Sequence, residues 1–262
     1  MLYTCYEMVR DCRADLPEGW THFILYYVPV IRRILAQYAL DQAADPKLLE
    51  RVLQAVHRPD SSMFNTQEPA PERQFVAELR QNVLAELKPG TSEFHVDLEA
   101  MTAALQPLTM TERQAVWFET MHYAPGETGP MLRISAETVR NVRERAADMI
   151  RGNVDAWRGT LLAENGALLG AEAFAARGKD CLPAKAFLDV IEGRSLWRDR
   201  ELMDQHLRNC WHCVDHFCRL VEANEWLRGN QPLPPLEAEA FFQLLGVAVA
   251  RPSGWKRLFG KN

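Results

Sequence analysis

The sequence predicts an all-α protein built from several small helical modules. Apolar residues recur three and four positions apart through most of the chain, which is the spacing of an amphipathic helix. Prolines, glycines and polar clusters divide these segments into stretches of helical length. With 262 residues and 47% hydrophobic content, the chain is long enough for two or three small domains with packed cores.

The first helical patterns lie in the N-terminal third of the chain. Residues 3–40 follow the helical period, and Pro29 is expected to kink that helix or to divide it in two. Residues 46–57 predict a short helix with a proline in its first turn. A loop rich in proline, serine and asparagine follows at 58–71, and the next helix is predicted over 72–87.

Residues 97–158 predict helices that are interrupted by one turn-rich stretch. Thr111 and Gln114 fit a capping box at the start of the helix before the turn. Ser135 is expected to cap the helix after the turn. A helix, a turn and a second helix with an apolar stripe are typical of a helix-turn-helix, whose second helix can enter the major groove of DNA.

The densest group of metal-ligand residue types lies between residues 180 and 220. Cys181, His206, Cys210 and Cys213 form a C-x24-H-x3-C-x2-C series. Thiolate and imidazole ligands suit Zn²⁺, and residues four and seven positions after a histidine share one face of a helix. Four protein ligands leave no open position for water, so the series predicts a structural Zn²⁺ site.

Three further residues crowd the same turns and leave the ligand set open. His216 can replace His206 as a ligand, but the interpretation we favour is that His212, His216 and Cys218 are all supporting or packing residues. A free cysteine is a common buried residue, and this is our interpretation of the two N-terminal cysteines.

Composition and missing motifs exclude several function classes. The net charge of −5 argues against a protein that mainly binds nucleic acid non-specifically. Six cysteines without a signal peptide indicate metal ligands or free thiols in a reducing, cytoplasmic environment. The longest apolar runs, 23–31 and 241–250, are too short to span a bilayer, so we expect a soluble protein. With no H-E-x-x-H motif or phosphate-binding loop, and with Glu201 and Asp204 interpreted as surface charges, we expect no enzymatic activity.

Residues 97–151 resemble region four of the extracytoplasmic-function RNA polymerase sigma factors. More weakly, EGWTHFILYYVPVIRRILAQY and PERQFVAELRQNVLAEL resemble the first and last helices of sigma region two. The residues that carry the region-four resemblance are Leu105, Leu108, Glu112, Arg113, Ile134, Ser135, Thr138, Val139, Ala146, Ile150 and Arg151.

The cysteine-rich stretch is similar to the zinc-binding anti-sigma domain. AKAFLDVIEG and RDRELMDQHLRNCWHC resemble its two conserved helices. The resemblances together imply four parts in this order: a region-two-like domain at 1–90, a region-four-like helix-turn-helix at 97–158, a zinc-binding anti-sigma-like domain at 159–228 and a C-terminal tail at 229–262.

The resemblances imply a bacterial transcription regulator that is a sigma-like factor with its own inhibitor in cis. Its partners would be core RNA polymerase and promoter DNA, and the zinc module would block the sigma-like modules until a signal, such as thiol oxidation, loosens it. In the family the second helix of the helix-turn-helix contacts the −35 element, and here that surface would consist of Glu137, Thr138, Arg140, Asn141 and Arg143.

Departures from the sigma pattern favour an alternative, a sigma-like adaptor that binds a partner protein without recognising a promoter. Pro130 falls within the first helix of the helix-turn-helix, and Arg133 occupies a turn position that often requires a positive φ. Residues 111–158 carry seven Arg against seven Asp and Glu, which weakens phosphate binding. Where the family has acidic residues and glutamines for polymerase binding, this chain has Lys47, Glu50 and Arg51.

Overall fold

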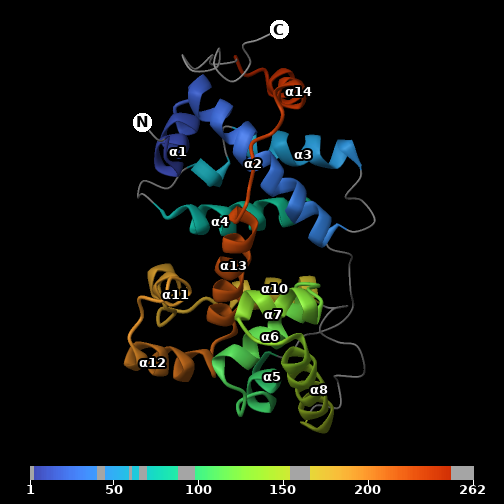
Figure 1. Ribbon diagram of the computed structural model, residues 1–262, viewed down its shortest axis with the longest axis vertical. Helices are drawn as coiled ribbons and strands as arrows, with labels where there is room; N and C mark the ends of the chain where they lie inside the picture. The colour runs from blue at the N-terminus through green and yellow to red at the C-terminus, as the bar shows by residue number, and fades with distance from the viewer. Residues whose placement is uncertain are drawn as a thin grey trace. The chain divides into compact units, whose positions relative to one another are not determined.

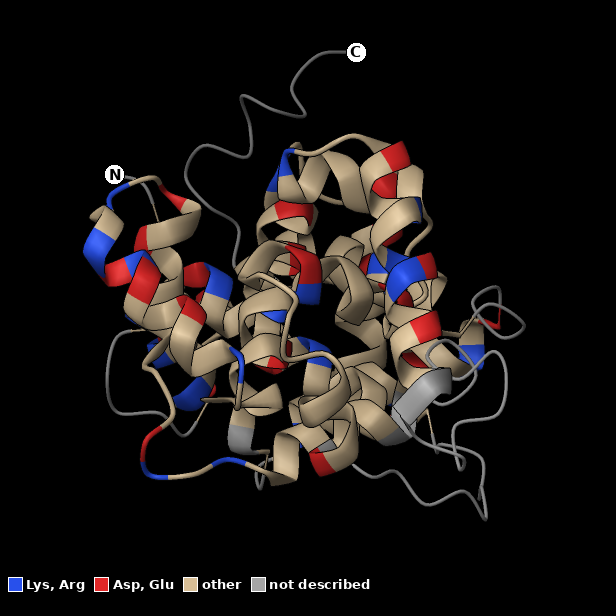
Figure 2. Cartoon of the chain, turned by 90° about the horizontal axis from the view of Figure 1, so that it is seen from below, with Lys and Arg blue, Asp and Glu red and all other residues tan. Residues whose placement is uncertain are grey.

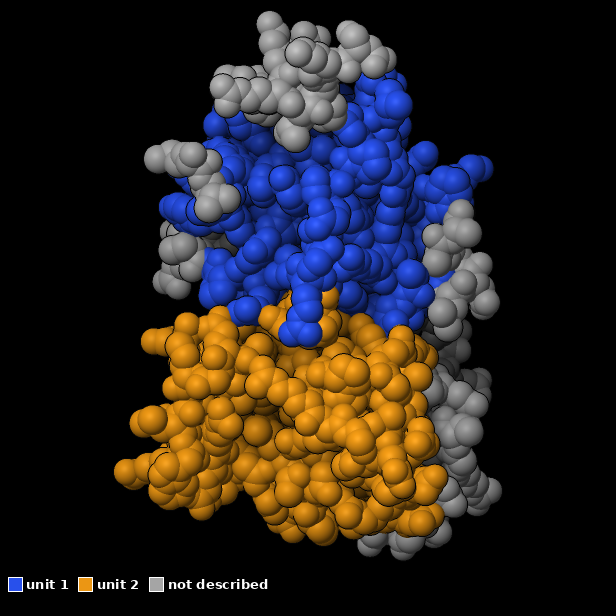
Figure 3. Space-filling view, in the orientation of Figure 1, with its two compact units in different colours: residues 1–88, 226–262 blue, residues 89–225 orange. Residues whose placement is uncertain are grey.

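The computed structural model describes residues 3–39, 45–58, 61–64, 70–87, 98–153 and 166–248. Within these ranges the chain forms thirteen α-helices, one short 3-10 helix and no β-strand, which confirms the predicted all-α class (Figure 1). The chain divides into two compact units (Figure 3). One comprises Met1–Lys88 and Trp226–Asn262, and the other comprises Pro89–Glu225. No helix in the described ranges is long and apolar enough to cross a membrane.

The first unit is built from both ends of the chain. Its elements are α1 (Cys5–Arg13), α2 (Pro17–Tyr38), α3 (Pro46–His57), the 3-10 helix η1 (Ser62–Phe64), α4 (Glu72–Glu86) and α14 (Pro235–Leu245). The helix predicted over 46–57 is confirmed as α3, which begins where the Asp45 side chain accepts a hydrogen bond from Lys47 N. The helix predicted over 72–87 is confirmed as α4, one residue shorter at its end.

The break between α1 and α2 corrects the expectation for residues 3–40. The chain leaves the helix at Ala14–Leu16, where Asp15 adopts a φ of 53°, and α2 then continues without division through Pro29. The proline does not end the helix because most of the surrounding turns are buried among apolar neighbours of the same unit.

The hydrogen bonds around Pro29 are completed from a distant part of the chain. A proline has no N–H, so it cannot donate to the carbonyl four residues earlier, which here belongs to Leu25. Leu233 N donates to that carbonyl over 2.8 Å. The side-chain amide of Asn230 donates to the adjacent carbonyl of Tyr26, also over 2.8 Å. The segment before α14 therefore supplies donors that α2 lacks.

Aromatic residues of α2 form the centre of the first unit. Phe23 stacks on Tyr27 with ring centroids 5.6 Å apart, and Tyr27 meets Phe75 of α4 edge to face at 5.1 Å. Trp20 contacts Phe64 of η1 in the same manner, at 5.1 Å. These pairs join three elements into one core, and edge-to-face and offset contacts of this kind are favourable for aromatic rings.

The second unit contains the predicted helix-turn-helix and the cysteine-rich stretch. Its helices are α5 (Leu98–Ala104), α6 (Met110–Thr120), α7 (Pro125–Leu132), α8 (Ala136–Asn153), α10 (Gly166–Ala175), α11 (Ala184–Ile191), α12 (Trp197–Leu207) and most of α13 (Trp211–Leu227). The segments that resemble region four and the anti-sigma domain thus fold within one compact unit.

The helix-turn-helix forms with one correction to its predicted caps. Ser135 caps α8 as expected, accepting a hydrogen bond from Thr138 N over 3.0 Å. The capping box of α6, however, is Thr109 with Glu112 rather than Thr111 with Gln114. The helix starts two residues earlier because the Glu112 carboxylate accepts from Thr109 N over 2.8 Å, a stronger acceptor than an amide.

The turn between α7 and α8 has the features that the sequence indicates. Pro130 lies inside the short helix α7, and Arg133 takes the left-handed conformation with a φ of 59°. Gly129 is needed here because a Cβ atom at this position would lie 2.8 Å from the Ile134 carbonyl oxygen. The close approach lets α7 and the start of α8 pack at short range.

Candidate metal centre

Three thiols gather at the predicted metal site. The sulfur atoms of Cys181, Cys210 and Cys213 all lie within 4.8 Å of one another. Cys181 Sγ and Cys210 Sγ are 3.8 Å apart, and two sulfurs of a tetrahedral thiolate site with metal–sulfur bonds of ~2.3 Å would also be about 3.8 Å apart. His206 Nε2 lies 3.1 Å from Cys213 Sγ. The three cysteines could hold a metal ion, and the histidine adjoins them.

The four residues come from three segments and do not lie on one helix, which corrects the expected geometry. His206 lies in the last turn of α12, which ends at Leu207. Cys210 precedes α13, and Cys213 lies in its first turn. Residues 208–210 form a turn between the two helices, and this turn brings the histidine to the thiols. Cys181 reaches them from the loop before α11.

Backbone N–H groups already point at two of the sulfurs. Gly178 N donates to Cys181 Sγ over 3.2 Å, and Leu182 N donates to Cys213 Sγ over 3.3 Å. Such hydrogen bonds stabilise thiolates and fix the orientation of ligand sulfurs. The pKa of Cys210 is lowered because the Cys213 thiol donates a hydrogen bond to it, and the same bond raises the pKa of Cys213. Thiolate is the form that binds metal ions.

The alternative ligands lie among other partners. His212 is buried, and its Nδ1 donates to the carbonyl of Ala173 over 3.2 Å. The ring of His216 packs edge to face against Phe187, and burial lowers its pKa to about 4. Cys218 is fully buried, and the metal-ligand cluster found in the described ranges does not include it.

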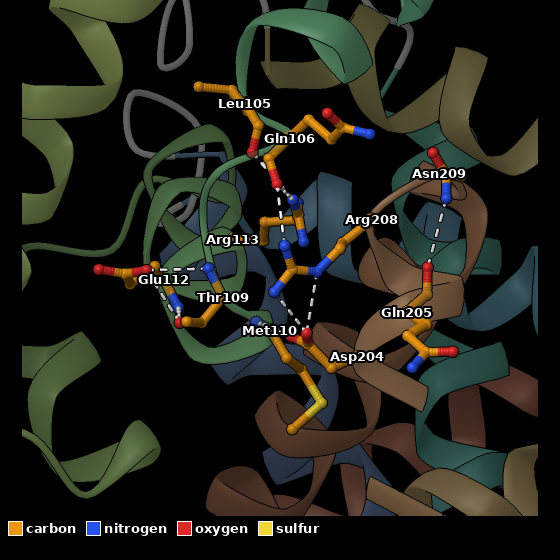
Figure 4. A network of polar contacts seen from close by, with 10 residues as sticks. All are labelled: Leu105, Gln106, Thr109, Met110, Glu112, Arg113, Asp204, Gln205, Arg208 and Asn209. Carbon is orange, nitrogen blue, oxygen red and sulfur yellow. Dashed lines mark hydrogen bonds and ion pairs between the residues drawn. The ribbon is translucent and has the colours of Figure 1, made fainter. Parts of the chain in front are cut away.

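A polar network ties the last turn of α12 to the start of α6 (Figure 4). Asp204 accepts a hydrogen bond over 2.5 Å from the backbone N–H of Met110, which is the first residue of α6. The same carboxylate forms an ion pair with Arg208 over 2.7 Å. Arg208 donates to the carbonyl of Gln106 over 3.4 Å, and the buried Arg113 donates to the same carbonyl over 2.6 Å. Asp204, predicted to be a surface charge, therefore caps α6. No local pattern could reveal this, since its partner is 94 residues away.

The turn that carries two of the thiols also packs against α6. Trp211, between Cys210 and Cys213, stacks on the fully buried Trp117 of α6 with ring centroids 5.2 Å apart and planes inclined by 23°. The Trp117 indole donates to Asp215 of α13 over 3.1 Å. Any shift of this turn would therefore disturb the packing of α6.

Four of the five predicted DNA-contact residues lie on the outer side of α8. Glu137, Thr138, Arg140 and Asn141 are exposed. Along the helices as a whole, basic and acidic residues are interspersed (Figure 2).

Arg143, the fifth residue, is buried and is held by neighbouring helices. Its guanidinium donates to the carbonyls of Ala115 and Tyr123, over 3.0 and 2.9 Å, and to Thr128 Oγ1 over 2.9 Å. The side chain is committed to joining α6, α7 and α8, so it is not part of the exposed surface of α8.

The chain matches no family model, and no curated protein and no solved structure is significantly similar to it.

Proposed function

We propose that this protein is a zinc-binding transcription regulator, in which a sigma-like helix-turn-helix is restrained in cis by an anti-sigma-like metal module. In this proposal Cys181, His206, Cys210 and Cys213 are the four ligands of a structural Zn²⁺. Three thiolates and an imidazole are a common donor set for such sites. The bound ion would stabilise the fold around it, and its four ligands would hold the turn before α13 in place.

The observation that carries the proposal is the contact of α6 with the segment that joins α12 to α13 and carries three of the proposed ligands. Trp211, two residues from Cys213, stacks on Trp117, and Asp204, two residues from His206, caps α6. Both contacts leave the outer side of α8 exposed. The restraint we propose therefore acts through α6 on polymerase binding, rather than by covering the DNA-facing helix.

Point variants test this proposal better than a truncation, because the segment that carries the cysteines contributes Asp215 and Trp211 to the core around Trp117. The wild-type protein and the Cys213→Ser variant would be compared in three assays. These measure bound zinc by mass spectrometry, capture of core RNA polymerase and promoter-dependent transcription. Zinc-loaded wild type is expected to bind polymerase weakly, whereas Cys213→Ser loses zinc and binds polymerase. Cys218→Ala is the matched control, since this buried thiol lies outside the cluster and its loss should preserve zinc.

One observation favours the adaptor as a second candidate. Arg143 is buried and Arg145 forms an ion pair with Glu112, so the outer side of α8 offers little free positive charge for phosphates. If neither wild type nor Cys213→Ser binds polymerase or DNA while zinc behaves as expected, the regulator is excluded and the adaptor remains.

A further inference from the structure

The first two turns of α12 expose large apolar side chains. Trp197 is 76% exposed, Leu196 at the N-cap is 69% exposed and Leu202 is 56% exposed. The helix is fixed on its other side, where Met203 and Leu207 are buried. Exposed apolar side chains that are grouped on one element indicate an interaction surface, whereas scattered ones do not.

The exposed side of α12 is a continuous stripe. Trp197, Arg198, Glu201, Leu202 and Gln205 fall within an arc of about 140° on a helix of 3.6 residues per turn. All five are exposed. Within the ranges that the structure describes, neither Arg198 nor Glu201 forms an ion pair. We call these five residues the α12 stripe.

The α12 stripe is complementary to itself. If two copies of α12 run antiparallel about a two-fold axis between residues 199 and 200, each Trp197 meets Leu202 of the second copy. The same axis brings each Arg198 to Glu201 of the second copy. A two-fold contact requires such a match, since each residue must suit its counterpart on the same surface.

We infer that the α12 stripe is a homodimer interface, in which two copies of α12 pair antiparallel. The apolar ends of the stripe bury Trp197 and Leu202 against each other, and the charged pairs set the antiparallel direction. A single helix pair is a small interface, so the dissociation constant is expected to be on the order of micromolar. This inference goes beyond the proposed function and does not depend on it.

Charge reversal in the whole chain, purified without chelator, tests the interface. Sedimentation velocity over a micromolar concentration series should show a monomer–dimer equilibrium for the wild type. Arg198→Glu sets two carboxylates against each other, and Glu201→Arg sets two guanidiniums against each other. Each single reversal should raise the dissociation constant about tenfold or more, because like charges now face across the axis.

A double variant and a mixture of the two single variants decide whether the α12 stripe pairs with itself. The double variant Arg198→Glu/Glu201→Arg restores both charge pairs and should dimerise like the wild type. An equimolar mixture of the two single variants should form heterodimers, since one copy offers two acidic residues and the other two basic ones. Lys185→Glu, an exposed reversal on α11, is the control and should leave the equilibrium unchanged.

A wild type that stays monomeric throughout the series would overturn the inference. So would a double variant as weak as its parents, because that result assigns the losses to something other than the pairing of Arg198 with Glu201. Unchanged zinc content and helical circular dichroism in every variant would show that the fold is intact.

Discussion

At the scale of single residues, buried guanidiniums join the helices of the second unit. Arg143 reaches three acceptors on α6, α7 and the intervening loop, and Arg113 donates to the carbonyls of Leu105 and Gln106 over 2.9 and 2.6 Å. A planar fork can serve several carbonyls at once, whereas an ammonium group cannot match that geometry. These arginines resemble surface charges in the sequence and are structural residues in the fold.

Replacing Arg143 should therefore destabilise the second unit even when the charge is kept. Arg143→Lys leaves some of the three buried acceptors without a donor, and the free energy of unfolding is expected to fall by about 2–3 kcal/mol. Urea unfolding monitored by far-UV circular dichroism would measure the change. Arg140→Lys, on the exposed side of the same helix, should stay within about 0.5 kcal/mol of wild type. Equal effects from both variants would contradict the structural role of Arg143.

His22 gives the first unit a dependence on pH. Its ring lies between Tyr3 and Tyr26, with centroids 4.9 and 4.5 Å away, and burial lowers its pKa to about 4. The unfolded chain has the higher pKa and binds a proton first. The stability contributed by the neutral ring is therefore complete above pH ~6.5 and is lost as the pH falls toward about 4.

His22→Gln should remove this part of the acid sensitivity. Between pH 7 and pH 4.5 the wild type is expected to lose about 1–2 kcal/mol more than the variant, a value reduced for the partial exposure of the ring. Urea midpoints of both proteins at several pH values would test this. Parallel curves would mean that His22 does not titrate as described.

At the scale of elements, the turn between α7 and α8 combines one strained residue with one close approach. Arg133 adopts the left-handed conformation, which costs a non-glycine residue roughly 1–2 kcal/mol. Gly129, by contrast, has no room for a side chain beside the Ile134 carbonyl. The two positions therefore respond to substitution in opposite directions.

Arg133→Gly should stabilise the second unit by about 1 kcal/mol, because glycine adopts this conformation without strain. Gly129→Ala should destabilise it by about 1–3 kcal/mol, because the added methyl group meets backbone atoms that cannot move away freely. Thermal unfolding of the two variants beside wild type would measure both effects. A stabilising Gly129→Ala would show that α7 and α8 are further apart than described.

At the scale of the whole molecule, the C-terminal segment is part of the first unit. Leu233 and Asn230 donate to α2 where Pro29 leaves it short of a donor, and Arg32 of α2 pairs with Glu237 of α14 over 2.6 Å. Phe242 of α14 is buried. Residues 229–248 are therefore structural, although they follow the second unit in sequence.

Ending the chain after Gly229 should destabilise the first unit, because it exposes the apolar surface under α14 and leaves the Leu25 carbonyl without its donor. Hydrogen exchange in α2 would report the loss as faster exchange around Pro29. A chain ending after Ala248 keeps all of these contacts and is the matched control. Equal exchange in the two truncated chains would contradict the structural role of this segment.

Local signals in the sequence predicted the elements well. A proline in the first turn marks α3, and Ser135 marks the start of α8, because caps and first turns depend on residues within a few positions. The three cysteines of the metal cluster were predicted for a similar reason, since their residue types and spacing are specific.

Partners that are distant in sequence could not be predicted in this way. Neither the donor to the Leu25 carbonyl nor the contact of Asp204 with α6 leaves a pattern beside it. Pro29 was predicted to kink or divide a helix, because the remote donors that support α2 at this point cannot be recognised from local spacing. The burial of Arg143 was missed because an arginine beside apolar positions has the same pattern whether its guanidinium faces solvent or carbonyls.

The discontinuous first unit has a consequence for biosynthesis. The ribosome synthesises residues 1–88 early, yet α14, which completes their core, follows about 150 residues later, or about 8–30 s at typical elongation rates. During that interval the nascent chain presents unfinished apolar surface, because the whole second unit is synthesised before α14. The N-terminal helices should thus be the part of the protein most in need of chaperones during translation.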